Sequence, residues 1–396
     1  MFSLDAIQSA LQEAGLDGWL LYDFRGLNPL SRRVLKLADN QMGSRRWFYW
    51  IPAQGKPHKL VHRIEDDALD HLPGSKTIYL RWQELEAGIK TMIGGQGRVA
   101  MEYSPRNGNP YIARVDAGTV ELVTSFGPEV VSSGDLIQLF EATWDDDQEA
   151  MHLAACQVTD AAFTVAWKTI AAAIRNDGGI EEMAVSDAIM QHFADHHCVT
   201  YHPPIIGRGP NGGLPHYETG TGTNTRIQEG DLVLVDLWCK LDKPRSTYSD
   251  HTRMGFVGLE VPQKYADIFN IVAAARDAGI DYVQQAYAAG RPVQGWEVDD
   301  ATRAVIEQAG YGEQFRHRTG HNIGQEVHGN GAHMDNLETR EERFVLPRTC
   351  FSIEPGIYLP EFGVRSEINV WIDGNRKVHV TGGNRQTSIV PILLEY

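Results

Sequence analysis

The chain has 396 residues, which is long enough for two domains, and 42 % of them are apolar, which is enough for ordinary buried cores. Acidic residues outnumber basic ones by 52 to 36, giving a formal net charge of −16. A surface this negative repels nucleic-acid phosphates and anionic membranes, so the composition argues against those partners and favours peptides or small molecules.

The N-terminus and the cysteines both favour a cytoplasmic location. The first residues include Asp5 and lack an apolar core, unlike a signal peptide, and Leu4, Ile7 and Leu11 instead have helical spacing. No apolar run approaches the roughly 18 residues of a membrane span. The cysteines lack a CxxC pair, so we expect a reducing environment and no structural disulfide; they are Cys156, Cys198, Cys239 and Cys350.

Residues 1 to about 140 alternate short apolar strands with helical stretches, a pattern typical of an α/β domain. We find no catalytic constellation in this region. The aromatic run 47–50 is interpreted as core, because large aromatic side chains are usually buried. The expected strands are 18–22, 47–51, 59–61, 77–80 and 99–101.

The second half of the chain predicts an α+β unit with mainly antiparallel strands. A boundary is expected within 132–147, at a Ser-Ser-Gly turn followed by the acidic run 145–147. A long helix should follow, because there is no Gly or Pro from Glu141 to Asp177, and the acids suit its positive end. Further helices are expected at 180–196, 263–289 and 298–309.

The segment 207–212 matches GxGxxG, but we do not interpret it as a nucleotide site. The dinucleotide-binding version must open a helix directly after a strand. Here Pro210 and the following Asn-Gly-Gly-Leu-Pro sequence break any helix.

Acids and histidines lie at the ends or centres of five apolar, strand-like segments: 232–236, 248–257, 317–328, 351–356 and 363–370. In the last segment, Val364, Ile368 and Val370 would share one face of a strand, with Arg365 and Glu367 on the other. A carboxylate inside a buried strand is costly unless it is paired or bound to metal.

Together these side chains predict a metal centre, although each alone is more often a turn residue or an ion-pair partner. Carboxylate and imidazole ligands suit divalent ions such as Mn²⁺, Zn²⁺ or Co²⁺, of which Mn²⁺ is our first expectation. Four carboxylates balance the charge of two such ions.

The motifs resemble those of the M24 family of "pita-bread" metallopeptidases, which includes methionine aminopeptidase, aminopeptidase P, prolidase and creatinase. Segment 320–328 resembles the family's GHxIGxxxH motif and 354–358 its EPG(I)Y motif. The resemblance implies a creatinase-like α/β N-terminal domain, 1–140, and an α+β pita-bread catalytic domain, 141–396. It also implies two divalent ions and, by analogy, a homodimer.

The family's five metal ligands fall on residues of this chain in the expected order. Asp250 and Glu367 would bridge the ions, Asp236 would complete one shell, and His321 with Glu354 the other. The resemblance further implies that His328 contacts substrate, and that His216, in the Leu-Pro-His-Tyr loop 214–217, is another substrate-side histidine.

His317 and Arg365 indicate the proline-directed branch of the family, which methionine aminopeptidases do not share. Two features depart from the family pattern: Asp236 and Asp250 are 14 residues apart instead of about 11, with an apparent insertion at 243–245, and Gly329 stands where an acid is usual. Both features bear on substrate preference more than on metal binding.

We therefore predict an Xaa-Pro dipeptidase, with a metal-bridging hydroxide that attacks the carbonyl before proline. Glu354 is the expected proton carrier and His328 a donor to the oxyanion. His216 and His317 would orient substrate or move protons, and Arg365 would anchor a substrate carboxylate or neighbouring acids. The alternative is aminopeptidase P, which releases the residue before proline from longer peptides. A peptide-binding protein without activity is disfavoured, because no ligand is lost.

Overall fold

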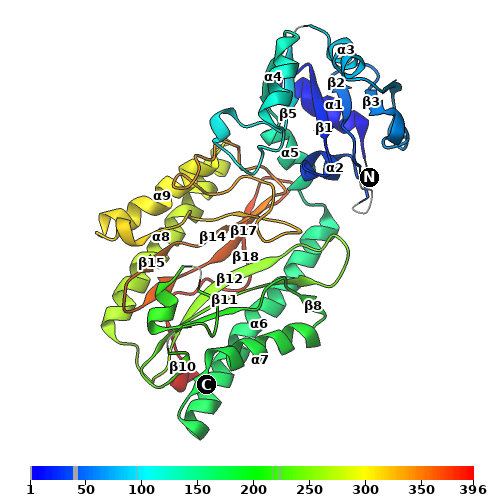
Figure 1. The fold of residues 1–396 in the computed structure, drawn as a ribbon. Coiled ribbons are helices and arrows are strands. Elements are labelled where there is room, and N and C mark those ends of the chain that lie inside the picture. Colours follow the sequence, from blue (N-terminus) through cyan, green and yellow to red (C-terminus); the bar gives the residue numbers. More distant parts are fainter. Residues whose placement is uncertain (1, 39–42, 96, 216, 223) are drawn as a thin grey trace. The chain divides into compact units, whose positions relative to one another are not determined.

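The computed structural model describes residues 2–38, 43–95, 97–215, 217–222 and 224–396. The chain divides into two compact units, Met1–Glu141 and Ala142–Tyr396 (Figure 1). No helix in the described part of the chain is long and apolar enough to cross a membrane.

Unit 1 is built on a mixed six-stranded sheet in the order β4-β3-β2-β1-β5-β6. Strand β2 is antiparallel to β1 and β3, whereas the β3–β4, β1–β5 and β5–β6 pairs are parallel. The strands are β1 Gly18–Asp23, β2 Trp47–Pro52, β3 His58–His62, β4 Ser75–Tyr79, β5 Arg98–Met101 and β6 Glu129–Ser132. They overlap all five strands that the sequence predicts.

Helices cover both faces of this sheet, so its central strand is buried on both sides. Alternate residues of β1 enter two separate apolar clusters, Trp19 and Leu21 in one and Leu20 and Tyr22 in the other. The helices are α1 Leu4–Glu13, α2 Pro29–Val34, α3 Trp82–Ile93, α4 Ala117–Ser125 and α5 Gly134–Glu141. The expected α/β layering of this region is therefore present.

Unit 2 begins with the expected long helix, α6 Asp146–Asp177. Asp145 caps it, because its carboxylate accepts a hydrogen bond from the Gln148 backbone N–H at 3.0 Å. The acidic residues of the first turn lie at the positive end of the helix dipole. The other helices are α7 Glu182–Asp195, α8 Gln263–Ala288, α9 Gly295–Gln308 and the short α10 Ile392–Glu395.

Two sheets, antiparallel except for the parallel β12–β19 pair, carry the candidate site of unit 2. One has the order β19-β12-β11-β8, with β9 also pairing β11, and the other has the order β13-β14-β17-β18. Their strands are β8 Cys198–Val199, β9 Ile205–Arg208, β11 Leu232–Leu241, β12 Ser249–Phe256, β13 Asn322–Ile323, β14 Cys350–Ile353, β17 Ile368–Ile372, β18 Val378–Thr381 and β19 Val390–Pro391. Two small ribbons complete the unit: β7 Ile180–Glu181 with β10 Arg226–Ile227, and β15 Gly356–Tyr358 with β16 Gly363–Arg365.

Segment 363–370 is not the single strand that the sequence predicts. It divides into β16, which pairs β15, and β17, which pairs β14 and β18, with Ser366 and Glu367 between them. The alternation of apolar and charged residues does not sort them into an inner and an outer face, because both faces are covered. Val364 and Ile368 are buried, and so are Arg365 and Glu367. The GxGxxG segment continues from β9 into a 3₁₀ helix, Gly209–Gly213, and opens no α-helix.

Candidate metal centre

Two neighbouring strands present the first two candidate ligands on one face. In the antiparallel β11–β12 pair, Asp236 lies opposite Thr252, and Trp238 lies opposite Asp250. Side chains two residues apart on a strand point the same way, so both aspartates lie on the same side of the sheet. Both are buried, and Asp236 lies in the middle of β11, whose apolar residues the core holds in place.

His321 is held against β14 by a close backbone approach. Its N–H donates to Ser352 Oγ at 3.0 Å, and its C=O accepts from the Ser352 N–H at 2.8 Å. The preceding Gly320 is required here, because a Cβ at that position would lie 1.9 Å from the Ser352 carbonyl oxygen. The glycine of the motif therefore allows the segment carrying His321 to reach the site.

The two glutamates reach the site from the ends of strands in the second sheet. Glu354 directly follows β14, and its N–H donates to the Thr319 carbonyl at 2.7 Å. Glu367 lies between β16 and β17, and its N–H donates to the Thr252 carbonyl of β12 at 3.2 Å. That bond links the two sheets beside the cluster.

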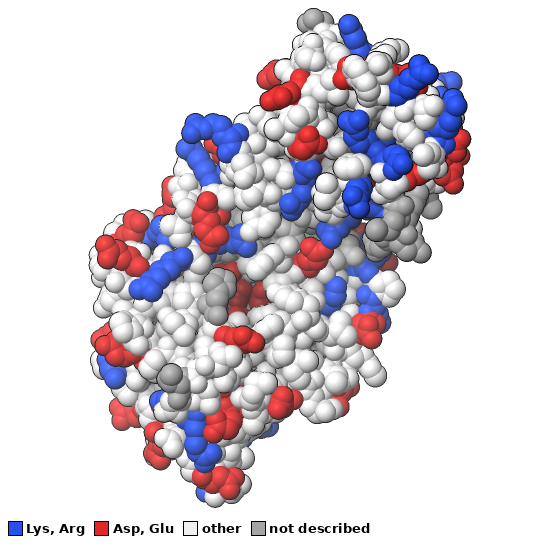
Figure 2. Space-filling model, viewed as in Figure 1, with Lys and Arg blue, Asp and Glu red and all other residues white. Residues whose placement is uncertain are grey.

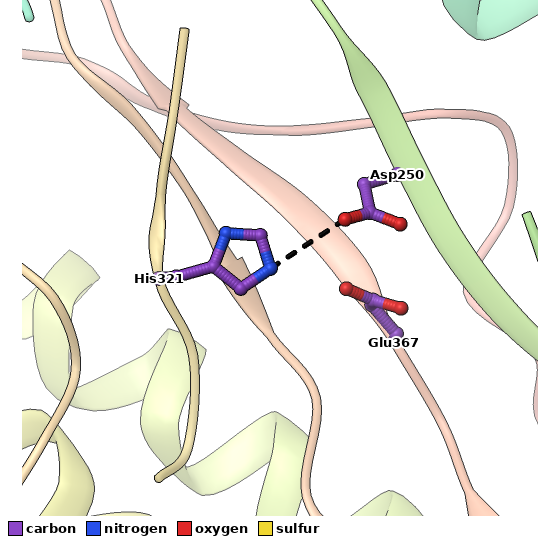
Figure 3. A group of neighbouring side chains, drawn as sticks. All are labelled: Asp250, His321 and Glu367. Atoms are coloured by element: carbon purple, nitrogen blue, oxygen red, sulfur yellow. Dashed lines mark ion pairs between the residues drawn. The ribbon is translucent and has the colours of Figure 1, made fainter. Parts of the chain in front are cut away.

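The five predicted ligands form one cluster, in which four are buried and the Glu354 side chain is 15 % exposed. One ligand atom each from Asp250, His321 and Glu367 lie within 4.8 Å of one another, and Figure 3 shows the three side chains converging. His321 Nε2 lies 3.5 Å from Asp250 Oδ2 and 3.3 Å from Glu354 Oε1. Thr252 Oγ1 lies 3.1 Å from Asp236 Oδ1 and 2.8 Å from Glu367 Oε2, and its single proton is donated to one of them at a time, which joins the remaining ligand to the group.

Burial and mutual repulsion oppose the charged forms of the four carboxylates. Burial raises the pKa of Asp236 to about 6 and that of Asp250 to about 7, although the Arg365 charge lowers both. The pKa values of Glu354 and Glu367 are raised by burial and by the other carboxylates. Burial lowers the pKa of His321, which keeps the imidazole neutral and able to bind a metal.

The donor set fits a divalent metal centre. Asp250 Oδ1 is buried and has no hydrogen-bond partner within the described residues. A buried carboxylate oxygen without a partner is costly, and a bound cation would remove that cost. Oxygen and imidazole donors suit divalent ions, although this arrangement does not select one of them. Acidic side chains are visible at the bottom of a hollow in Figure 2.

A hydrogen-bonded chain runs from His317 to the cluster. His317 Nε2 lies 2.6 Å from the Tyr358 hydroxyl, and Arg365 Nη1 donates to that hydroxyl at 3.1 Å. Arg365 also forms an ion pair with Asp236 and donates from Nε to Thr252 Oγ1 at 3.0 Å. Of the two roles expected for Arg365, these contacts favour anchoring a neighbouring acid.

Thr252 and Tyr358 are contacts that the sequence interpretation missed. Thr252 holds two candidate ligands, and the signal for it was its spacing, two residues after Asp250 on the same face of β12. Tyr358 is the last residue of the motif that begins at Glu354. Its role cannot be read from the motif, because it comes from the contacts of its hydroxyl with His317 and Arg365.

The structure describes one of the two other predicted histidines. The His328 ring packs edge-on against His321 with centroids 4.3 Å apart, so it lies at the cluster. His216 lies outside the described residues.

Comparison with known proteins gives a family match over residues 150–374, to Metallopeptidase family M24. The Xaa-Pro dipeptidase of Lactobacillus delbrueckii subsp. lactis is 35 % identical over 198 residues, 49 % of each chain. The aligned part thus spans about half the length of the curated relatives it matches.

Solved structures resemble almost the whole chain. Dipeptidase PepE from Mycobacterium ulcerans matches with a TM-score of 0.67 and 23 % identity, covering 98 % of this chain and 96 % of that one. The Xaa-Pro dipeptidase from Bacillus anthracis matches with a TM-score of 0.62 and 22 % identity, covering 98 % of both. These likenesses confirm the expected fold, an α/β N-terminal unit followed by an α+β pita-bread unit. With the family match over more than half its length, the chain belongs to metallopeptidase family M24.

Proposed function

We propose that the chain is a two-metal hydrolase that cleaves the Xaa-Pro bond of dipeptides. The observation that carries the proposal is the largely buried five-donor cluster of Asp236, Asp250, His321, Glu354 and Glu367. A relative 35 % identical over half the chain is named an Xaa-Pro dipeptidase, which supports the substrate class.

The five cluster residues would hold the two ions, and Mn²⁺ is the ion we propose, ahead of Zn²⁺ and Co²⁺. When bound, such ions lower the pKa of a water from about 16 to about 7 and polarise the substrate carbonyl. Thr252 Oγ1 lies within hydrogen-bond distance of both Asp236 and Glu367 and donates its one proton to either carboxylate, which holds the two side chains together. Arg365 holds Asp236 from the other side through their ion pair.

Glu354 is proposed as the group that carries the proton. Its Oε1 accepts from Ser352 Oγ at 3.0 Å, which fixes the carboxylate beside His321. Burial raises its pKa, and a raised pKa brings a carboxylate closer to that of an effective base at neutral pH. The nitrogen of an Xaa-Pro bond carries no proton of its own, so Glu354 would deliver one as the proline leaves.

The histidines are proposed to act on the substrate. His328, packed against His321, would donate a hydrogen bond to the carbonyl oxygen as charge develops on it. His317 would orient substrate or move protons along its contact with Tyr358, and His216 is proposed as a further substrate contact. We also propose a homodimeric, cytoplasmic enzyme, with a creatinase-like unit before its catalytic unit.

The test is a Mn²⁺-supplemented assay that compares Xaa-Pro dipeptides, tripeptides with proline at the second position, and Met-Ala peptides. The proposal predicts that the Xaa-Pro dipeptides are the best substrates and that alanine in place of proline lowers the rate strongly. Faster release of the first residue from tripeptides would assign aminopeptidase P instead. Equal rates for proline and alanine would overturn both assignments.

A further inference from the structure

One edge of β12 has side chains and a backbone N–H where a neighbouring strand would be expected. Along its first edge β12 pairs with β11, but within the described residues its second edge meets a strand, β19, only at Gly255 and Phe256. Backbone groups of alternate residues point to the same edge of a strand, and buried groups there need partners. The groups that replace the missing strand lie beside the metal centre.

An asparagine side chain takes the place of a strand at Asp250. Asn369 Oδ1 accepts a hydrogen bond from the Asp250 N–H at 3.1 Å, and Asn369 Nδ2 donates to the Asp250 carbonyl at 2.5 Å. We name these two bonds the amide clamp. Asn369 is fully buried in β17, where it lies between Ser352 of β14 and Thr381 of β18. The second sheet therefore holds the backbone of a candidate ligand of the first sheet directly.

The amide clamp closes a ring that contains two candidate ligands. Glu367 lies two residues before Asn369, and on β12 Asp250 lies two residues before Thr252. The Glu367 N–H donates to the Thr252 carbonyl at 3.2 Å, and Glu367 Oε2 lies 2.8 Å from Thr252 Oγ1. The two short segments are thus joined at both ends. A ring of this kind fixes the offset between the segments, because neither can slide without breaking hydrogen bonds.

This offset sets the separation of the Asp250 and Glu367 carboxylates. The two side chains approach each other from different segments (Figure 3), and one ligand atom of each lies within 4.8 Å of the other. Like charges this close repel each other, so other contacts have to hold them together. The amide clamp bonds the backbone of Asp250 and leaves its carboxylate free to bind a metal.

We propose that Asn369 is a positioning residue that fixes the separation of Asp250 and Glu367 and thereby sets the affinity of the centre for its second divalent ion. This inference rests on the proposed two-metal centre and names a residue outside the five ligands on which that centre depends. Groups that orient metal ligands typically contribute about 10- to 100-fold in metal affinity. The ion bound second should lose most, because the family resemblance places both carboxylates between the two ions.

Gln386 provides a matched control on the same edge of β12. Its Oε1 accepts from the Met254 N–H at 2.9 Å, and its Nε2 donates to the Met254 carbonyl at 2.7 Å. Met254 is a buried core residue and is not a candidate ligand. Replacing the side chain leaves in place the Gln386 carbonyl, which accepts from Arg276 Nη1 at 2.9 Å. Both amides thus support β12, but only Asn369 holds a candidate ligand.

The experiment measures Mn²⁺ binding to chelated protein by isothermal titration calorimetry, for the wild type, Asn369→Leu and Gln386→Met. Each substitution keeps the approximate size of the side chain and removes both hydrogen bonds. The wild type should bind two ions. Asn369→Leu should bind the second ion about 10- to 100-fold more weakly, and a higher Mn²⁺ concentration should restore its kcat. Gln386→Met should keep both affinities.

Thermal unfolding of the same chelated proteins separates positioning from support of the fold. Both variants should lower the Tm, because each leaves buried backbone groups without partners. Only Asn369→Leu should also weaken the second ion. If Asn369→Leu does not fold, Asn369→Ala and Gln386→Ala, which introduce no bulk, make the same comparison.

Specific outcomes would overturn the inference. Equal affinities for the wild type and Asn369→Leu, or an equal loss in both variants, would mean that Asn369 only supports the fold. A wild type that binds a single ion would overturn the inference together with the two-metal proposal. The proposed substrate fails separately: if Asn369→Leu weakens the second ion while proline and alanine are equally good at the second position of a dipeptide, the amide clamp remains and the Xaa-Pro assignment does not.

Discussion

Both units bury carboxylates, but in opposite ways. In unit 1, fully buried Glu102 accepts hydrogen bonds from Trp19 Nε1 at 2.7 Å, Asn28 Nδ2 at 2.8 Å, Ser31 Oγ at 2.6 Å and Ser133 Oγ at 3.1 Å. In unit 2, four carboxylates converge, three of them buried and that of Glu354 partly buried, and Asp250 Oδ1 lacks a partner within the described residues.

The difference separates a structural acid from a ligand set. Glu102 receives two donors on each oxygen, so the protein itself satisfies the group that burial desolvates. Burial raises the pKa of Glu102 and of all four cluster carboxylates, so the difference lies in their partners. The cluster has the ion pair of Arg365 with Asp236, yet Asp250 Oδ1 lacks a partner within the described residues. An arrangement that is costly when empty is typical of a site completed by cations.

The largest expected effect is on turnover of Glu354→Gln. The amide keeps the size of the side chain but removes its charge and its basicity, and loss of a general base typically costs about 10² to 10⁴ in rate. Metal affinity should also fall, because three carboxylates then face the same ions. Turnover and bound metal per chain, measured by elemental analysis, check this; wild-type protein should bind about two divalent ions.

The same substitution in unit 1 is the matched control. Glu102→Gln should leave kcat/KM of the folded protein unchanged, because Glu102 contacts no cluster residue. Without metal, Glu354→Gln should be no less stable than wild type, since one repelling charge is gone. If Glu354→Gln keeps near-wild-type turnover with two ions bound, Glu354 is not the proton carrier.

Removal of metal by a chelator should lower the unfolding temperature of unit 2 and not that of unit 1. A ligand that binds only the native state at 100 times its Kd adds about 2.7 kcal/mol, which corresponds to about 5 to 10 °C for a unit of this size. Addition of Mn²⁺ to chelated protein should therefore raise the Tm of the transition of unit 2 and restore activity. A fully active preparation without metal would contradict the metal centre.

Glu102→Gln should instead destabilise unit 1, with or without metal. The amide nitrogen cannot accept the hydrogen bonds that one carboxylate oxygen accepts, and an unsatisfied buried donor costs about 1 to 3 kcal/mol. Denaturant unfolding of the chelated and Mn²⁺-loaded variants measures this loss. A loss that appeared only in the loaded protein would mean that Glu102 acts through the metal centre.

The sequence predicted the ligands better than their surroundings. Asp236 lies inside β11 directly after four apolar residues, and Glu354 directly follows β14, and local patterns of that kind can be read without knowing which strands pair. The roles of Thr252 and Arg365 depend on contacts between segments more than 100 residues apart, which no local pattern encodes.

The same limit explains the difference in fold at 363–370. The alternation in 363–370 predicted one strand, but the break at Ser366–Glu367 is set by pairing with β14 and β15, which the periodicity does not contain. Likewise, Glu102 receives its four donors from three separate segments of unit 1, so no local pattern marks it as a satisfied buried acid.

The smallest expected effect is the pH dependence of stability, which should change sign with metal. The pKa of Asp250 is about 7 in the folded, metal-free protein, against 3.8 for an ordinary aspartate. Between these values the folded state holds a proton that the unfolded state has lost, so its stability is greatest below the ordinary pKa and falls as pH rises toward 7. Asp236, with a pKa of about 6, acts in the same direction.

Metal binding needs the deprotonated carboxylates and releases those protons, so the loaded protein should gain stability over the same pH range. Burial also raises the pKa of Glu102, but that contribution is common to both forms and cancels in their difference. The difference in Tm between loaded and chelated protein should therefore widen steadily from pH 5 to 7.5. A difference independent of pH would mean that the ions do not displace protons from these carboxylates, and the comparison between the two buried environments would lose its basis.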